Sequence, residues 1–444
     1  MFYLIENTEQ LSKLHPYGDC YINVIPLSSQ YHPLLTQTSL IYFKQIDSKG
    51  LMFTIHHSEA FAVDEQKVKD FILKHKNVFV LDKKVTAQLL GEEFLDSKVK
   101  DLQLLSLSTS TTPPYIHDFD THIHTHFQRL YGDKPYVNSI IPISKHYQTQ
   151  EAIFSVIKHL MLLPTLNTYY NDEYIKVYYG IESQGLALDT PLFNEHFNPT
   201  NPNFSIKDNK IYTQYNLYNF TSRPTNAFNN INFAALNKTN GSREAIICKN
   251  DMLFEFDYEA YHPRILGKLI GYEFDKGSIH THLGQMYFKK DTLTDEEYQA
   301  SKELTFKQLY GGVFDQYKDI PFYAKVVQYT DKIYRDFNSL GYITLVGGRQ
   351  LFAKDVVNPT PQKLLNYLIQ SGETYYNVNS IKGVQEYLAT GKKSCILLYT
   401  YDSILVDYHR DDGKETLREI KRLLEEPFGF KVSAKYGKNY QNLK

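Results

Sequence analysis

The spacing of hydrophobic and polar positions changes abruptly within residues 253–271, LFEFDYEAYHPRILGKLIG. Phe254 and Phe256 alternate with polar residues, which predicts a short, half-buried strand. Apolar side chains then recur at helical spacing over residues 264–269, so a helix should follow. The pattern therefore places Asp257 where a strand gives way to a helix, with its carboxylate free to point into a cleft.

A second acidic residue lies in a similar setting much later in the chain. Residues 396–407 read ILLYTYDSILVD, which predicts a strand, a turn at Asp402 and a second strand. Two aspartates on strands of one sheet can hold a pair of Mg²⁺ ions, the geometry of two-metal phosphoryl transfer. Taken alone, these stretches favour a simpler alternative, in which turn aspartates accept hydrogen bonds from backbone N–H groups.

The stretch between these two aspartates favours the metal site over the simpler alternative. Residues 301–312 read SKELTFKQLYGG, and Lys302, Phe306 and Tyr310 are spaced by four, so they share one face of a predicted helix. An ammonium group, a phenyl ring and a phenol on one face suit a nucleoside triphosphate. The alternative is an ordinary amphipathic helix along which the lysine side chain extends to solvent.

Together these stretches resemble the family A DNA polymerases of the bacterial polymerase I type, in a compact, phage-like form. Residues 257–264 resemble the family's motif A, residues 302–311 its motif B on the fingers helix, and residues 401–402 its motif C. Three further matches lie in the family's order: residues 212–216 followed by 221–226 resemble its T-G-R stretch, residues 279–281 its I-H-T stretch, and Gln370 its primer-template glutamine. Six ordered matches make this resemblance specific.

The resemblance implies a DNA-directed DNA polymerase, a nucleotidyltransferase of DNA replication. In such an enzyme the primer 3′-hydroxyl attacks the α-phosphate of a dNTP and pyrophosphate leaves. Catalysis and the binding of two Mg²⁺ ions are assigned to Asp257 and Asp402, with the Tyr258 carbonyl as a further metal ligand. The implied nucleotide contacts are His262, His280, Lys302, Phe306 and Tyr310, and the implied primer-template contacts are Arg223, Asn226 and Gln370. The expected partners are primer-template DNA, a dNTP and a processivity factor.

The helix that carries motif B departs from the family's pattern at one position. Tyr298 stands four residues before Lys302, where the family has an arginine. Triphosphate binding should therefore depend more on Lys302 and His280, or on the neighbouring Lys289 and Lys290.

Two further departures affect which nucleotide would be used. Motif C usually reads H-D-E, but residues 401–403 read Y-D-S, and His262 replaces a motif A glutamate that blocks the 2′ side of the sugar. The Asp-Ser pair resembles the single-subunit RNA polymerases, which use NTPs, although that group has methionine at Phe306 and much longer chains. A second alternative is a non-catalytic DNA-binding relative of a polymerase. Retention of both Asp257 and Asp402 argues against that alternative.

Residues 1–165 alternate between predicted strands and helices, which indicates a mixed sheet covered by helices. We predict strands at 21–25, 40–43 and 78–81, helices at 68–73 and 84–90, and a loop at 106–114. A unit in this position resembles the family's ribonuclease H-like 3′–5′ exonuclease domain. The strand at 21–25 lacks carboxylates and Thr86 stands where the family has aspartate, so Asp118 and Asp120 alone cannot hold a metal pair. We expect an exonuclease fold without exonuclease activity.

The rest of the chain should contain a reduced thumb or connector at 166–210 and a palm with fingers at 211–444. Residues 174–189 resemble the start of the family's thumb, but residues 198–203, NPTNPN, indicate a loop where a long helical thumb should continue. We predict helices at 364–370, 375–387 and 416–426, and a tight turn at 347–349. The expected fold class is a multidomain α+β and α/β protein with an antiparallel palm sheet, helical fingers, a reduced thumb and an N-terminal exonuclease-type domain.

The composition restricts the kind of nucleic-acid binder this protein can be and indicates its cellular compartment. The chain has 444 residues, 42% of them hydrophobic and 22% charged, an ordinary globular balance with room for two or three domains. A formal net charge of −2 excludes a globally basic nucleic-acid binder, so any DNA tract must be a local basic groove. Three widely spaced cysteines fit a reducing compartment, and we find neither a signal-peptide pattern nor a membrane-spanning apolar run. The expected location is the cytoplasm.

Overall fold

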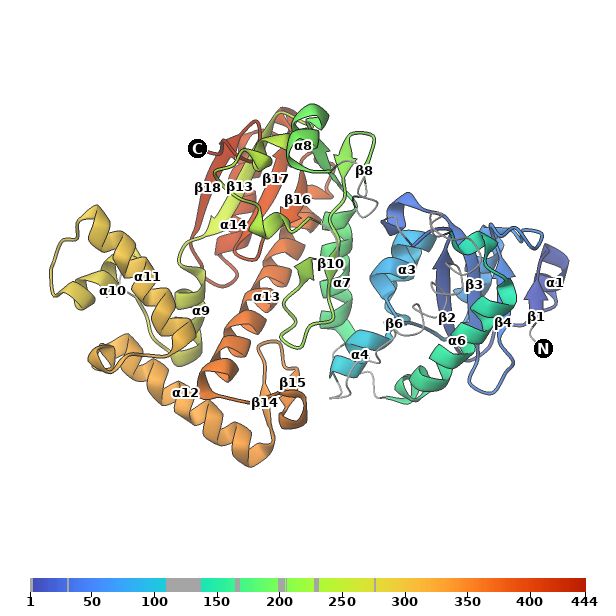
Figure 1. Cartoon of the computed structure of the whole chain (residues 1–444), viewed down its shortest axis with the longest axis horizontal. Coiled ribbons are helices and arrows are strands. Elements are labelled where there is room, and N and C mark those ends of the chain that lie inside the picture. Colours follow the sequence, from blue (N-terminus) through green and yellow to red (C-terminus); the bar gives the residue numbers. More distant parts are fainter. Residues whose placement is uncertain are drawn as a thin grey trace. The chain divides into compact units, whose positions relative to one another are not determined.

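The chain forms two compact units (Figure 1). The computed structural model describes residues 3–29, 32–108, 137–163, 168–198, 204, 206–226, 231–274 and 277–444. The first unit comprises Met1–Tyr218 with Asn226–Asn232, and the second comprises Asn219–Thr225 with Phe233–Lys444. The domain boundaries expected at residues 165 and 210 remain predictions.

The first unit is built on a six-stranded mixed sheet with strand order β1-β4-β3-β2-β5-β6. Its strands are β1 (Tyr3–Ile5), β2 (Asp19–Pro26), β3 (Thr38–Lys44), β4 (Leu51–Thr54), β5 (Asn77–Val80) and β6 (Val99–Asp101). Strand β3 is antiparallel to β2 and β4, whereas the pairs β1–β4, β2–β5 and β5–β6 are parallel. The three strands predicted in this region are confirmed as parts of β2, β3 and β5.

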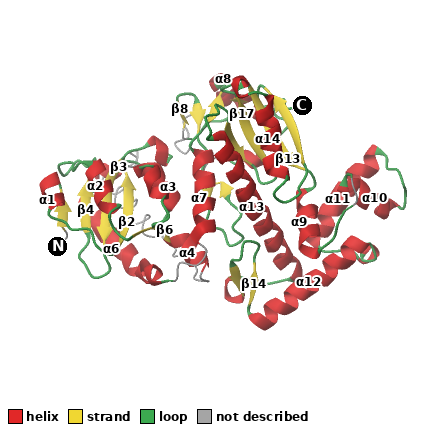
Figure 2. Cartoon of the chain, turned by 180° about the vertical axis from the view of Figure 1, so that it is seen from behind, coloured by secondary structure: helices red, strands yellow, loops and turns green. Residues whose placement is uncertain are grey.

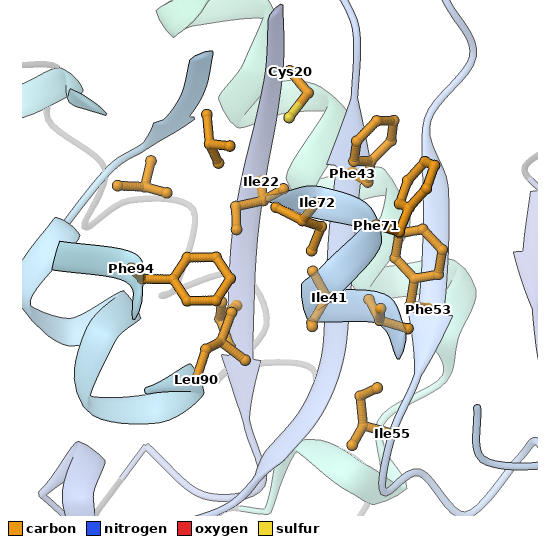
Figure 3. Close-up of a cluster of buried hydrophobic side chains, with 14 of the residues drawn as sticks. Cys20, Ile22, Ile41, Phe43, Phe53, Ile55, Phe71, Ile72, Leu90 and Phe94 are labelled. Atoms are coloured by element: carbon orange, nitrogen blue, oxygen red, sulfur yellow. The ribbon is translucent and has the colours of Figure 1, made fainter. Parts of the chain in front are cut away.

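Helices cover both faces of this sheet. Successive residues of a strand point to opposite sides, and the central strands carry buried apolar side chains on both sides. The helices are α1 (Thr8–Ser12), α2 (Glu65–Ile72), α3 (Lys83–Leu90), α4 (Leu102–Ser108) and α6 (Ile143–Ile157). Ile22 and Ile41 pack with Ile72 of α2 and Leu90 of α3, as Figure 3 shows. On the other face the neighbouring Tyr21 packs with residues of α4 and α6.

The prediction of a loop at 106–114 is wrong for its first three residues. Helix α4 continues to Ser108, and the rest of that prediction falls outside the described residues. The carboxylate of Asp101 accepts a hydrogen bond from the Leu104 N–H over 2.8 Å, which stabilises the start of this helix.

The remainder of the first unit contains α7 (Thr168–Glu182), α8 (Thr190–His196) and the short strands β7 (Leu186–Leu188), β8 (Ile206–Lys207) and β9 (Lys210–Ile211). Strand β9 pairs antiparallel with β7 and with β8. Helix α8 was not predicted. It begins at a cap in which Asp189 accepts from the Leu192 N–H, and Phe193 stacks on Phe197 with ring centroids 4.7 Å apart.

The second unit contains a four-stranded antiparallel sheet, as predicted. Its order is β16-β17-β13-β18, with β16 (Cys395–Tyr399), β17 (Ser403–Tyr408), β13 (Met252–Tyr258) and β18 (Val432–Gly437). Helices α13 (Pro361–Leu388) and α14 (Lys414–Glu425) pack against it (Figure 2). The Tyr258 hydroxyl donates to the Leu424 carbonyl of α14 over 3.2 Å, so one face of β13 is turned toward this helix.

Helix α13 corrects a prediction, because the helices expected at 364–370 and 375–387 form one continuous helix of 28 residues. Residues 371–374, which lack an apolar pattern, are all buried inside it. Their polar groups have partners, which the periodicity of apolar positions does not reveal.

The rest of the second unit is mainly helical, with α9 (Tyr261–Ile270), α10 (Ile279–Phe288), α11 (Asp295–Gly311), α12 (Pro321–Leu340) and the hairpin β14 (Tyr342–Thr344) and β15 (Gln350–Phe352). These helices and α13 share a core that includes Leu266, Leu309 and Phe322. Gly347 and Gly348, both with positive φ, form the predicted tight turn of the hairpin. None of the described helices combines the length and the hydropathy needed to cross a membrane.

Candidate active site

The structure brings Asp257 and Asp402 to the same end of the four-stranded sheet. Asp257 of β13 pairs with Ser403 of β17, and Asp402 directly precedes Ser403. The Tyr258 N–H donates to the Asp402 carbonyl over 2.9 Å, which fixes the strand against the turn. Two acidic residues that are far apart in the sequence are therefore neighbours on one sheet.

A strained turn presents Asp402. Tyr401 has a φ of +72°, in the left-handed region that non-glycine residues seldom adopt. The Thr400 N–H closes the turn by donating to the Ser403 carbonyl over 2.9 Å, and the Asn377 amide donates to the Tyr401 carbonyl over 2.6 Å. Strain of this kind persists only where the surroundings enforce it, and it is concentrated at functional sites.

Burial and like charge raise the pKa of both aspartates. Burial, with the carboxylates of Asp402 and Glu255, raises the pKa of Asp257 to about 7, although Lys435 and Lys238 oppose this effect. Burial also raises the pKa of Asp402, and the Glu373 carboxylate adds to that rise. A bound cation would relieve the repulsion between these carboxylates, so the electrostatics of this site favour a cation.

Glu255 is an acidic residue that the motif comparison did not identify. It lies two residues before Asp257 on β13, so the two side chains share the face opposite the one turned toward α14. Burial raises its pKa, while Lys435, its partner on β18, and Lys238 lower it. The alternation of residues 253–257 would have placed this carboxylate beside Asp257.

The acidic pair fits Mg²⁺ in its chemistry. Among the described residues, no three His, Cys, Asp or Glu side chains are grouped to hold a metal ion by themselves. Mg²⁺, however, prefers carboxylate oxygens, keeps several waters, and is usually held by one or two carboxylates together with substrate phosphates. Asp257 and Asp402 meet that requirement, and the Tyr258 carbonyl remains a predicted ligand.

The predicted nucleotide residues of α11 lie on one face, as the spacing indicated. The rings of Phe306 and Tyr310 are nearly parallel, with centroids 6.2 Å apart, and the side chains are 42% and 39% exposed. The Lys302 ammonium lies 4.6 Å from the ring centroid of Tyr298. Tyr298, in the position of the expected arginine, therefore contacts the lysine but adds no charge.

His280 of α10 lies next to this face. Its ring centroid is 6.2 Å from that of Phe306, and its carbonyl accepts from the Ser301 hydroxyl over 2.6 Å. Burial, with the charges of Lys302 and Arg264, lowers the pKa of His280 to about 4, so the imidazole is neutral at pH 7. Its Nδ1 is buried and has no hydrogen-bond partner in the described part of the chain.

The two other candidate lysines differ in their surroundings. The Lys290 ammonium forms an ion pair with Glu297 at the start of α11, whereas Lys289 ends α10 in a left-handed conformation. Lys290 is therefore already paired, and it is a weaker candidate than Lys302 for a phosphate contact.

His262, on the first turn of α9, contacts residues of two other helices. Its Nδ1 is hydrogen-bonded to the Tyr310 hydroxyl, and its Nε2 contacts the Glu373 carboxylate of α13. Glu373 also accepts from Arg223 Nε over 2.9 Å, and the Arg223 guanidinium lies 3.8 Å from the ring centroid of Tyr401. Residues from five separate segments thus meet around Glu373, which sequence reasoning missed.

The remaining predicted residues lie in other settings. Gln370 is partly exposed on α13, one turn before Glu373. Asn226 belongs to the first unit, where its amide donates to the carbonyl of Ile231. Asp118 and Asp120 lie outside the described residues.

Comparison with known proteins establishes the fold. Neither a known protein family nor a curated protein sequence matches this chain. The structure is similar to the POL domain of Pol1 from M. smegmatis, solved in complex with DNA primer-template and dNTP. The TM-score is 0.68 and the sequence identity 14%, and the match covers 95% of this chain and 96% of that chain. At this identity the similarity shows a shared fold, that of this POL domain.

Proposed function

We propose that this protein is a template-directed DNA polymerase that adds dNTPs to a primer 3′-hydroxyl. The observation that carries the proposal is the placement of Asp257 and Asp402 at the same end of an antiparallel sheet, where burial and neighbouring carboxylates raise the pKa of both. The similar POL domain was solved with DNA primer-template and dNTP, and we assign the same partners to this chain.

In the proposed reaction, Asp257, Asp402 and the Tyr258 carbonyl would hold two Mg²⁺ ions. Such ions, when bound, lower the pKa of the attacking hydroxyl and neutralise charge on the triphosphate and the leaving group. The turn around the strained Tyr401 keeps Asp402 aimed at this position, so little rearrangement is needed at the moment of reaction.

The side chains of α10 and α11 would bind and orient the nucleotide. Lys302 provides the positive charge for the triphosphate, and His280, which lies next to Phe306, is the second proposed phosphate contact. The exposed rings of Phe306 and Tyr310 provide flat apolar surfaces for the base and the sugar. Arg223, Asn226 and Gln370 are the proposed contacts to the primer-template.

Other parts of the chain suggest how the enzyme would be used. We propose that the first unit is an exonuclease-type domain without nuclease activity, that the thumb is reduced, and that a processivity factor compensates for it. The three cysteines form no disulfide, which supports a reducing compartment such as the cytoplasm.

The experiment that tests this function is primer extension with separate dNTP and NTP mixtures. We expect the wild type to extend the primer with dNTPs in the presence of Mg²⁺, and we expect the Asp257→Asn variant not to extend it. Preferential extension with NTPs would favour the RNA polymerase alternative. Binding of primer-template without extension in either mixture would favour the non-catalytic alternative.

A further inference from the structure

Glu373 is a fully buried carboxylate at the centre of the candidate site. Its side chain is 0% exposed, and it forms an ion pair with Arg223. Arg223 Nε donates to Oε1 over 2.9 Å, and Arg223 Nη2 donates to Oε2 over 3.4 Å. A buried charge destabilises a protein strongly unless it is paired and hydrogen-bonded, so this contact is required for Glu373 to be tolerated there.

The second partner of Glu373 is His262. Glu373 Oε2 contacts His262 Nε2, and His262 Nδ1 is hydrogen-bonded to the Tyr310 hydroxyl. A carboxylate oxygen accepts hydrogen bonds, so Nε2 is the donor in this contact. The ring is thus bonded to Glu373 at one nitrogen and to Tyr310 at the other. These two contacts together fix the orientation of the imidazole.

The same segment of α13 also supports the turn that presents Asp402. The Tyr261 hydroxyl donates to the Asn377 side-chain carbonyl over 2.9 Å, and the Asn377 amide donates to the Tyr401 carbonyl over 2.6 Å. Arg223, held by Glu373, lies over the ring of Tyr401. One helix therefore supports both the turn that presents Asp402 and the residues around Tyr310.

We infer that Glu373 is a positioning residue for nucleotide selection. Its carboxylate holds His262 against Tyr310, so that the imidazole forms a rigid wall on the 2′ side of the sugar, and it holds Arg223 in place at the same time. This inference rests on the proposed function.

The two oxygens of Glu373 determine the most informative variant. Each oxygen is occupied by a donor, and an amide can accept with only one of its two terminal atoms. In Glu373→Gln, either Arg223 or His262 must therefore face an NH₂ group. We expect the ratio of kcat/KM for a matched dNTP to kcat/KM for the corresponding NTP to fall about ten- to a hundredfold, the range for a lost hydrogen bond to a charged group.

A rescue experiment separates positioning from general stability. His262→Glu alone places two carboxylates in contact, and we expect it to lower kcat/KM for the dNTP by about tenfold or more. In the double variant His262→Glu/Glu373→Gln, the amide can donate to the new carboxylate and accept from Arg223 with its oxygen. We expect this double variant to recover both the rate and the nucleotide ratio.

Two further variants complete the comparison. His262→Ala removes the wall itself and should lower the same ratio. Thr374→Val is the matched control. Thr374 is a buried neighbour on α13, and within the described part of the chain its hydroxyl donates only to the Gln370 carbonyl of the same helix. The control should leave the ratio within twofold of the wild type. If Glu373→Gln does not fold, the comparison of wild type, His262→Glu and the double variant decides the question.

The proposal is overturned if Glu373→Gln keeps the wild-type nucleotide ratio, or if the double variant is no better than His262→Glu. Binding of a fluorescent dNTP and NTP to the free protein is measured in parallel, because it requires neither primer nor chemistry. If the wild type extends no primer, the proposed function fails. A dNTP preference in binding that depends on Glu373 would still support the inference, and a binding ratio unchanged in Glu373→Gln would overturn it.

Discussion

Asp257 shows how the fold changes the chemistry of a single residue. Burial and two nearby carboxylates raise its pKa from 3.8 to about 7 in the metal-free protein. Below pH 4 the group is neutral in both the folded and the unfolded chain. Between pH 4 and pH 7 the unfolded chain releases this proton while the folded protein retains it, so this group makes the free energy of unfolding fall as the pH rises.

This shift predicts the stability of an Asp257→Asn variant. Without metal, the variant should melt at a higher temperature than the wild type at pH 8, and at a similar temperature near pH 4. Mg²⁺ should raise the melting temperature of the wild type at pH 8 but not that of the variant. Thermal denaturation at both pH values tests this, with the exposed Asp331→Asn as control. An equal response of both proteins to Mg²⁺ would contradict the metal assignment.

The sequence was informative for residues that stand at recognisable positions in a pattern. Asp257 follows a period-two strand, and Lys302, Phe306 and Tyr310 are spaced by four, so their placement could be predicted. Glu373 could not, because its partners Arg223 and His262 lie 150 and 111 positions away, and spacing along the chain does not report such contacts.

At the scale of elements, periodic segments were predicted well and polar buried segments were not. Strands β2, β3 and β5 and helices α2, α3, α9 and α14 follow clear apolar patterns, and each lies where it was expected. The middle of α13 is polar yet buried, so its continuity was missed. Helix α8 was missed because a capping aspartate and stacked phenyl rings stabilise it, and neither produces a helical apolar stripe over seven residues.

Strand β2 and its surroundings lead to a prediction about nuclease activity. Asp19, the one carboxylate of β2, accepts from the Asn77 amide over 2.8 Å, and the nearby Glu151 is paired with the Lys44 ammonium at 2.6 Å. These groups are already occupied by partners other than a metal. We expect no Mg²⁺- or Mn²⁺-dependent degradation of single-stranded DNA from its 3′ end.

A 3′-labelled and a 5′-labelled oligonucleotide would detect such degradation. The Asp257→Asn variant is the control, since it removes the proposed polymerase site and leaves the first unit intact. Nuclease activity that remains in this variant and is lost on mutation of Asp118 or Asp120 would contradict the prediction.

At the scale of the whole molecule, the proposed reduction of the thumb leads to a prediction about how long the protein stays bound to DNA. Its net charge is −2, and after α7 only α8 and three short strands are described before residue 212. Each lost contact between a basic side chain and a phosphate weakens DNA binding and flattens its dependence on salt, by a slope of about 0.9 per contact.

We therefore expect the isolated protein to release primer-template after a few nucleotides. The test is extension under conditions in which each enzyme molecule meets one primer only, together with the dissociation constant for primer-template at several salt concentrations. Short products and a shallow salt dependence are expected. Long products without any added protein would show that no processivity factor is needed.

The central claim is that Asp257 and Asp402 catalyse templated nucleotide addition, and single-turnover incorporation tests it most directly. Each dNTP is offered separately opposite each template base in Mg²⁺. We predict that only the complementary dNTP is added, and that Asp257→Asn and Asp402→Asn each slow the addition by about a thousandfold, equivalent to roughly 4 kcal/mol, while primer-template binding changes little. Addition that ignores the template, or either variant retaining more than a few per cent of the wild-type rate, would contradict the claim.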